Sequence, residues 1–140
     1  MKTFIYYSIL SLFTLVLATE SKAQQSDTGK ENYVVLTKKI EQLKPIILSA
    51  VALKAENETD FGDFQVILCG SEIGGITQAE KIGPFLQAAE AAGVEIKACG
   101  FSLEKFKVDT SKIPAEIETV ENGILYYLQL QKEGYYNISL

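Results

Sequence analysis

Cys69 and Cys99 are the residues of this 140-residue chain best suited to chemistry. Each ends an apolar run and is followed directly by a glycine. A deprotonated cysteine is a nucleophile that attacks disulfides, persulfides and other electrophiles. Because an even number of cysteines in an exported protein often forms a disulfide, a structural bridge between the two is the alternative reading.

Cys99 has the more favourable surroundings for a reactive thiol. It is followed by Gly100 and by a short helix that we expect at 102–108. The free N–H groups and the positive dipole end at a helix start stabilise a thiolate, and Gly100 allows the backbone to approach a bound group closely. We therefore predict that Cys99 is the catalytic residue. The predicted binding residues flank the two thiols: Cys69, Gly70, Gly100 and Ser102.

The role of Cys69 stays open between a second thiol, a disulfide partner and a pocket wall. If the second and third strands both lie beside the first, the two cysteines stand roughly 9 to 10 Å apart at a strand spacing of ~4.8 Å. A disulfide needs Cα atoms within about 7 Å. This arrangement disfavours an intramolecular bridge, although loop residues could close the gap.

The residue types that are absent exclude several kinds of site. The sequence contains no histidine, and its 13 basic residues are all lysines. These absences exclude a Ser-His-Asp triad, a Cys-His dyad, a histidine metal site and an arginine clamp for phosphate. Gly74-Gly75 lacks the flanking residues of a phosphate loop or a dinucleotide fingerprint. We therefore predict neither a cofactor nor a metal.

The first 23 residues have the pattern of a signal peptide. Lys2 precedes an apolar run at 4–17, and Ser21 and Ala23 supply small residues for cleavage after Ala23. The alternative is an uncleaved membrane anchor, but the run is shorter than the ~20 residues that a spanning helix needs. No later segment is long and apolar enough to span a membrane. We expect a periplasmic or secreted protein that is free of the membrane after cleavage.

The remaining chain divides into a polar, flexible tail at 24–32 and one domain at 33–140. Removal of residues 1–23 takes away two lysines and one glutamate, which changes the formal net charge from −5 to −6. Nucleic-acid binding needs a basic surface, so an acidic domain with dispersed lysines argues against a nucleic-acid partner.

Strand and helix patterns alternate along the domain. We expect strands at 33–37, 64–69, 94–99, 115–120 and 135–139. We expect one helix with Pro45 in its first turn and others at 84–92, 102–108 and 122–132, with a loop at 71–77. This alternation predicts a parallel sheet with helices on both faces, and both cysteines fall at the carboxyl ends of strands, where such sheets bind ligands.

The C-terminal part of the domain carries two further expectations. The last helix is predicted to turn Ile124, Leu125 and Leu128 inward. Tyr135 and Tyr136 are expected to alternate across the last strand, one inward and one at an edge or subunit contact. A small domain with an apolar, tyrosine-rich C-terminus favours self-association.

Several spaced segments resemble the DsrE/DsrF-like (TusD-like) family of small sulfur-relay proteins. They read GVEIKACG at 93–100, VENGI at 120–124 and LQKEGY at 130–135, and the resemblance runs from Tyr33 to the C-terminus. It implies a flavodoxin-like three-layer α/β sandwich with a mostly parallel five-stranded sheet, assembled as a homo-oligomer (trimer or hexamer). It also implies that Cys99 takes sulfur as a persulfide from a donor protein and passes it to an acceptor. The relay members are cytoplasmic, and the predicted signal peptide departs from that pattern.

Three functional hypotheses follow. The first is an exported sulfur carrier or thiol-redox protein that uses Cys99. The second is a non-catalytic module for small-ligand binding or assembly, in which the cysteines are packing residues. The third is a structural role for both cysteines as an oxidised pair.

Overall fold

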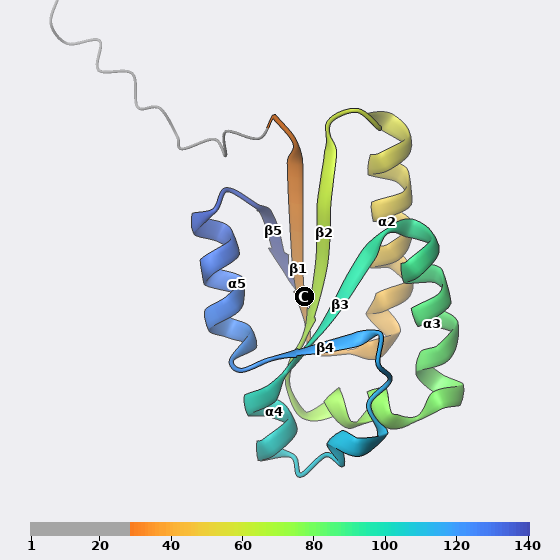
Figure 1. Ribbon diagram of the computed structural model, residues 1–140, viewed down its shortest axis with the longest axis vertical. Helices are drawn as coiled ribbons and strands as arrows, with labels where there is room; N and C mark the ends of the chain where they lie inside the picture. Colours follow the sequence, from red (N-terminus) through yellow and green to blue (C-terminus); the bar gives the residue numbers. More distant parts are fainter. Residues whose placement is uncertain (1–28) are drawn as a thin grey trace, which may run out of the picture.

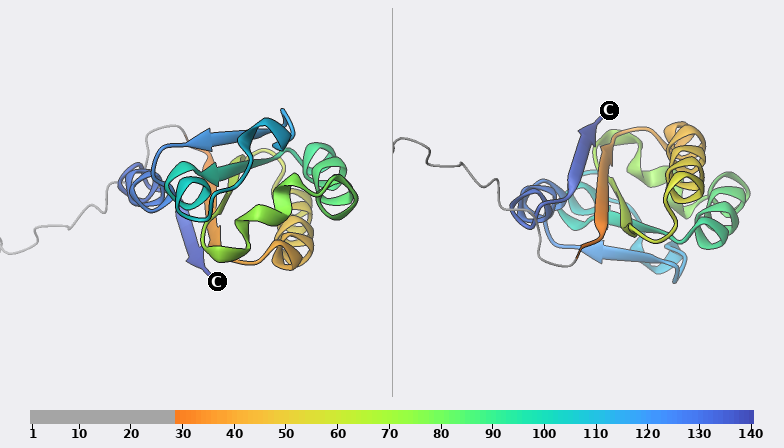
Figure 2. Two further views of the ribbon diagram at one scale, coloured as in Figure 1. Left: turned by 90° about the horizontal axis from the view of Figure 1, so that it is seen from below. Right: turned by 90° about the horizontal axis from the view of Figure 1, so that it is seen from above.

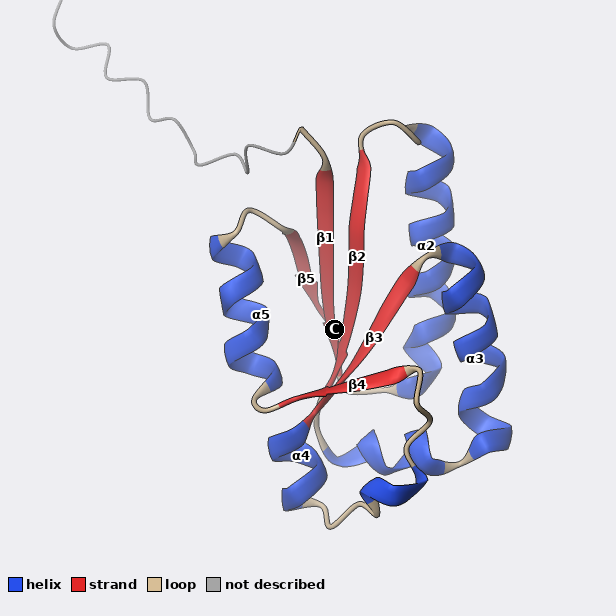
Figure 3. Ribbon diagram, viewed as in Figure 1, coloured by secondary structure: helices blue, strands red, loops and turns tan. Residues whose placement is uncertain are grey.

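The computed structural model describes residues 29–140 as one five-stranded, all-parallel sheet with the strand order β4-β3-β2-β1-β5 (Figure 1, Figure 3). The strands are β1 (Glu31–Thr37), β2 (Phe61–Leu68), β3 (Val94–Cys99), β4 (Ile117–Val120) and β5 (Tyr136–Ser139). The helices are α2 (Leu43–Glu56), α3 (Ala79–Ala92), α4 (Gly100–Lys105) and α5 (Gly123–Lys132). Short 3-10 helices are η2 (Ile40–Gln42), η3 (Ser71–Thr77) and η4 (Thr110–Lys112).

The predicted signal peptide, with its cleavage after Ala23, lies outside the described residues. The predicted tail at 24–32 lies partly outside them. Its last two residues, Glu31 and Asn32, belong to β1, so the ordered domain begins earlier than the sequence indicated. Among residues 29–140, no helix has both the length and the apolar character needed to cross a membrane.

The helices form two layers around the sheet. Helices α2 and α3 cover one face, and α5 packs on the other against β1, β2 and β3 (Figure 1, Figure 2). Right-handed crossovers explain this division: the chain moves in one direction from β1 to β4 and then returns past β1 to β5, which puts the last helix on the opposite face. The predicted flavodoxin-like three-layer α/β fold is thereby confirmed.

The order of the strands differs from the one on which the distance between the cysteines was based. β2 lies between β1 and β3, whereas in that arrangement β1 would separate them. Leu68 of β2 is in register with Ala98 of β3, and the residue after each of them is a cysteine. The two thiols therefore lie one strand spacing apart instead of two, and the distance argument against a disulfide no longer holds.

Helix α5 presents a different face to the core than its sequence pattern indicated. Ile124, Leu125 and Leu128 are 60%, 53% and 48% exposed, whereas its buried residues are Gly123, Tyr127 and Leu130. These three positions follow the spacing of one helical face. The phase of the helix is set at its start, where the glycine allows the backbone to approach the sheet.

Two other segments also depart from the expectations. Helix α3 begins at Ala79 and contains Pro84, at which we expected it to start. Its extra first turn is anchored by Ile82, which is fully buried. The segment at 71–77, expected as a loop, forms η3 and buries Ile73 and Ile76, because these apolar side chains complete the core beneath it.

Candidate functional site

Both cysteines lie at the carboxyl end of the sheet, as the sequence predicted. Cys69 directly follows β2 and Cys99 is the last residue of β3. Both are free thiols, and both residues are buried, with 6% and 3% of their surface exposed. The sheet therefore gathers the two most reactive side chains of the domain into one enclosed place.

Gly123 is the residue that both cysteines contact. Its backbone N–H donates a hydrogen bond to Cys99 Sγ at 3.2 Å. A Cβ atom at Gly123 would lie 2.7 Å from Cys69 Sγ and 2.9 Å from Cys99 Cβ, closer than any side chain tolerates. Only glycine therefore fits at the point where α5 begins, directly against the two thiols.

Asn122 caps α5 and leaves the Gly123 N–H for the sulfur. Its Oδ1 accepts hydrogen bonds from the N–H groups of Ile124 and Leu125, at 3.1 and 3.2 Å. The N–H of Tyr126 donates to the Asn122 carbonyl. The first N–H groups of a helix have no partner within it. The Asn122 side chain accepts from those of Ile124 and Leu125, and the N–H of Gly123 bonds to Cys99 Sγ.

Ser102 connects the segments that follow the two strands. The N–H of Gly70 donates to Ser102 Oγ at 3.1 Å, and the hydroxyl proton of Ser102 remains to donate to Cys99. Ser102 is itself buried. It lies in α4, the short helix whose N-cap residue is Cys99, so the predicted helix start after Cys99 is present, two residues earlier than expected.

The surroundings of Cys99 favour its thiolate. Burial raises the pKa of this thiol. Hydrogen bonds to the sulfur from the Ser102 hydroxyl, from the N–H groups of Gly123 and Ser102, and from the Cys69 thiol outweigh burial, and the net pKa lies below its ordinary value. Cys99 is therefore the member of the pair that ionises first.

Cys69 has the opposite tendency. Burial, the adjacent charge of Cys99 and the hydrogen bond that Cys69 gives to it raise the pKa of the Cys69 thiol to about 12, although Lys38 opposes the shift. Of the two thiols, Cys99 is the one whose ionisation the surroundings favour, and Cys69 is the one that keeps its proton and donates to it. Such a pair can make a nucleophilic attack through one sulfur while the other keeps its proton.

Gly70 and Gly100 have structural roles beside the thiols. Gly70 has a φ of 85°, a conformation that side chains disfavour, and this turn aims its N–H at Ser102. A Cβ at Gly100 would lie 3.1 Å from the carbonyl oxygens of Val120 and Glu121. The close approach that we predicted for a bound group at Gly100 is made here by the chain's own backbone.

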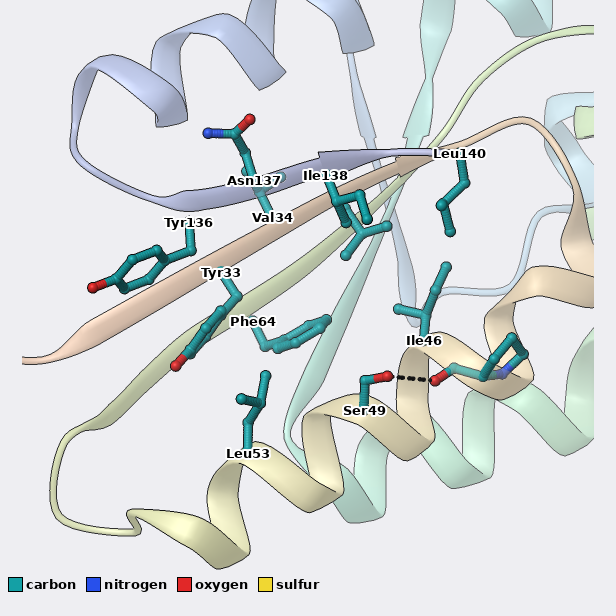
Figure 4. Close-up of a pocket in the computed structure, with 12 residues that line it drawn as sticks. Tyr33, Val34, Ile46, Ser49, Leu53, Phe64, Tyr136, Asn137, Ile138 and Leu140 are labelled. Carbon is teal, nitrogen blue, oxygen red and sulfur yellow. Dashed lines mark hydrogen bonds between the residues drawn. The ribbon is translucent and has the colours of Figure 1, made fainter.

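The structure also contains an open apolar groove that the sequence did not reveal. It has a volume of ≈ 330 Å³ and lies between α2 and the strands β1, β2 and β5 (Figure 4). Tyr136, Ile138 and Leu140 line it from β5 and the residue after that strand, although all three remain substantially exposed. Opposite them are Ile46 and Leu53 of α2.

The tyrosines of the C-terminus are divided between two environments. Tyr136 stacks on Tyr33 of β1 with ring centroids 5.4 Å apart. Tyr135 precedes β5, is half-buried and donates a hydrogen bond from its hydroxyl to Asp63 at 2.7 Å. The expected division into an inward and an edge position is thus present, but Tyr135 lies outside the strand.

Gly123 is the site residue that sequence reasoning missed. The Asn-Gly pair before an apolar helical pattern indicated a helix start, but not that this start lies against the cysteines. Within residues 29–140, no group of three or more His, Cys, Asp or Glu side chains is placed to hold a metal ion.

Comparison with known proteins identifies the fold alone. No protein-family description matches the chain, and no curated protein matches it. The structure of MTH1491 from Methanobacterium thermoautotrophicum, a protein of unknown function, is similar with a TM-score of 0.66 at 15% identity, covering 79% of this chain and 99% of that one. That of BT1422 from Bacteroides thetaiotaomicron, a conserved protein of unknown function, has a TM-score of 0.61 at 18% identity, covering 79% and 95%.

Proposed function

We propose that this protein is an exported sulfur carrier or thiol-redox protein in which Cys99 is the nucleophile. The observation that carries the proposal is the hydrogen bond from Gly123 N–H to Cys99 Sγ at the start of a ten-residue helix. A helix N-terminus and the Ser102 hydroxyl together stabilise negative charge on that sulfur. The resemblance of the sequence to sulfur-relay proteins supplies the substrate class, a sulfane sulfur.

The proposed reaction is a transfer between two thiol groups. The Cys99 thiolate attacks the outer sulfur of a donor persulfide, R–S–SH. A new sulfur–sulfur bond forms at Cys99, the sulfur–sulfur bond of the donor breaks, and R–S⁻ leaves. The transferred sulfur keeps its proton, and Cys99 becomes a persulfide that an acceptor thiolate can attack in the same way.

Two exposed apolar side chains mark where a donor or acceptor protein would approach. Phe101 follows Cys99-Gly100 and is 62% exposed, and Ile124 follows Gly123 and is 60% exposed. Both stand at helix starts that meet the buried thiols. A partner that covers them would exclude water from the transfer, which suits a persulfide.

Mass spectrometry of protein treated with inorganic polysulfide tests this function. We expect one added sulfur on Cys99 in Cys69→Ser, where no second thiol can displace it, and none in Cys99→Ser. Circular dichroism of each variant verifies that it is folded. Addition of sulfur to Cys69 alone, or no addition to Cys99 in folded Cys69→Ser, would overturn the proposal.

Export follows from the predicted signal peptide at 1–23. It would place the reaction in the periplasm or outside the cell, away from cytoplasmic sulfur donors. Fractionation of cells that express the full chain, with N-terminal sequencing of the mature form, tests this. A mature chain that begins at Gln24 is the expected result, and an intact N-terminus on membrane-bound protein contradicts it.

A second candidate function, an assembly module, is favoured by the apolar groove and the free sheet edge next to it. Within residues 29–140, β5 pairs with β1 and leaves its other edge open. We propose that a second copy of this chain occupies that edge, since the same edge on each copy allows a two-fold contact that covers backbone and apolar groups together.

The oligomeric state in solution tests the assembly. We expect Ile138→Asp to shift light-scattering mass toward the monomer, because it places a charge in the groove. The matched control is Leu48→Asp, an exposed apolar position on α2 that is not among the groove residues. A monomeric wild type, or an equal effect of both changes, would contradict a second copy in the groove.

A further inference from the structure

We propose that Cys69 is the resolving thiol of the site, so that Cys69 and Cys99 form a reversible dithiol–disulfide couple. The inference rests on the proposed function, because it requires Cys99 to make the first attack. It assigns a chemical role to the second cysteine, and it names small disulfides and persulfides as the species that the pair reduces.

The register of the sheet places the two cysteines for bond formation. Leu68 pairs with Ala98 on adjacent parallel strands, and the cysteines follow one residue later on each side. Neighbouring strands lie ~4.8 Å apart, within the separation of about 4.4 to 6.8 Å between Cα atoms that a disulfide accepts. Positions that match in register also point to the same face of the sheet.

Gly123 gives independent evidence that both side chains point to one place. An added Cβ there would meet Cys69 Sγ at 2.7 Å and Cys99 Cβ at 2.9 Å. Both cysteines therefore border the same small volume beneath the start of α5. A group that becomes attached to Cys99 Sγ is placed beside Cys69.

The chemistry proceeds in two exchanges. The Cys99 thiolate attacks a disulfide R–S–S–R, which forms Cys99–S–S–R and releases R–S⁻. The Cys69 thiol then loses its proton, and its sulfur attacks Cys99 Sγ. The Cys69–Cys99 bond forms, the bond to R breaks, and R–SH leaves with the proton. Both cysteines are oxidised and the external disulfide is reduced to two thiols. A dithiol reductant returns the couple to its starting state.

The first exchange prepares Cys69 for the second. While Cys99 is a thiolate, its charge and the hydrogen bond it accepts hold the proton on Cys69. Once Cys99 is bonded to another sulfur, that charge is gone and the hydrogen bond weakens. Lys38, which favours the charged form of Cys69, is unaffected by the change.

Treatment of the reduced protein with cystamine, a small disulfide, tests the couple. In the wild type we expect an internal disulfide, seen by mass spectrometry as the loss of two hydrogens with no cysteamine retained. In Cys69→Ser and Cys69→Ala we expect cysteamine to remain on Cys99. Blocking of free thiols followed by peptide mapping identifies the sulfur that carries each group.

The outcomes separate this inference from the function on which it rests. Wild-type protein that retains cysteamine on Cys99, with Cys69 still free for alkylation, would overturn the resolving role and leave the nucleophile in place. Folded Cys69 variants that acquire no cysteamine on Cys99 would overturn the proposed function itself.

Discussion

The backbone N–H of Gly123 lies 3.2 Å from Cys99 Sγ, although the two residues are 24 positions apart in the chain. The contact joins the end of β3 to the start of α5 on one face of the sheet. It makes a glycine, with no side chain of its own, part of the environment that sets the acidity of the candidate nucleophile.

Gly123→Ala should destabilise the fold and disturb the thiols. The new methyl group would press on Cys69 Sγ and on Cys99 Cβ, and overpacking of this kind costs about 1 to 3 kcal/mol. Urea unfolding measures the change. The matched control is Gly83→Ala in α3, where an added Cβ meets no atom of the described chain within 4 Å. That helical substitution should be neutral or stabilising by up to about 1 kcal/mol. Equal effects of the two substitutions would contradict the tight fit at Gly123.

Ser102→Ala should raise the pKa of the Cys99 thiol, because it removes the hydroxyl that donates to the sulfur. It also removes the acceptor of the Gly70 N–H, which costs about 1 to 3 kcal/mol if that group stays buried. When the rate of iodoacetamide reaction at Cys99 is measured against pH, the midpoint of the profile should move to higher pH. Ser49→Ala is the control, because it also removes a hydroxyl that makes a hydrogen bond. That hydroxyl donates to the Pro45 carbonyl within α2 and makes no bond to either cysteine. An unshifted profile in folded Ser102→Ala would show that the hydroxyl does not set the acidity.

The two thiols should titrate far apart. The pKa of Cys99 is lowered from 9.0 by hydrogen bonds that exceed the effect of its burial, whereas that of Cys69 is raised to about 12. Near neutral pH, iodoacetamide should therefore label Cys99 before Cys69 in reduced protein, as peptide mapping would show. Labelling of Cys69 first would reverse the assignment of the nucleophile.

The stability of the reduced protein should depend on pH through the same two groups. For Cys99, whose folded pKa is lowered, the stabilisation is present above the unfolded pKa and is lost as the pH falls through the folded pKa. For Cys69, whose folded pKa is raised, it is present below the unfolded pKa and is lost as the pH rises toward about 12. Urea unfolding of the wild type and Cys69→Ser across the alkaline range should show a steeper alkaline loss in the wild type. Superimposable curves would contradict the raised pKa of Cys69.

Oxidation of the pair should stabilise the domain. A bond between Cys69 and Cys99 closes a loop of about 30 residues, for which chain entropy gives about 3 to 4 kcal/mol if the native geometry accepts the bond without strain. Unfolding of the oxidised and reduced wild type gives the difference, and Cys69→Ser should show none. An oxidised form less stable than the reduced one would mean that the strand ends are held too rigidly for the bond.

The sequence by itself determined the alternation of elements and where each cysteine stands on its strand. Apolar runs that end in Cys69-Gly70 and Cys99-Gly100 indicate buried strands whose carboxyl ends carry thiols, and these are local patterns. Gly93, the residue that follows the predicted helix at 84–92, ends α3 with a φ of 72°. Local backbone preference and hydrophobic spacing are written in neighbouring residues, so they could be inferred without the fold.

Only the tertiary structure decided which strands are neighbours and what lies against the sulfur. The order that places β2 beside β3 depends on how whole helices cover the sheet, and no short segment encodes it. The same long-range packing turns Ile124, Leu125 and Leu128 outward and brings Gly123 onto the two thiols. A glycine adds nothing to a hydrophobic pattern, so the sequence gives no sign of the hydrogen bond from Gly123 to Cys99. Only the folded structure shows it.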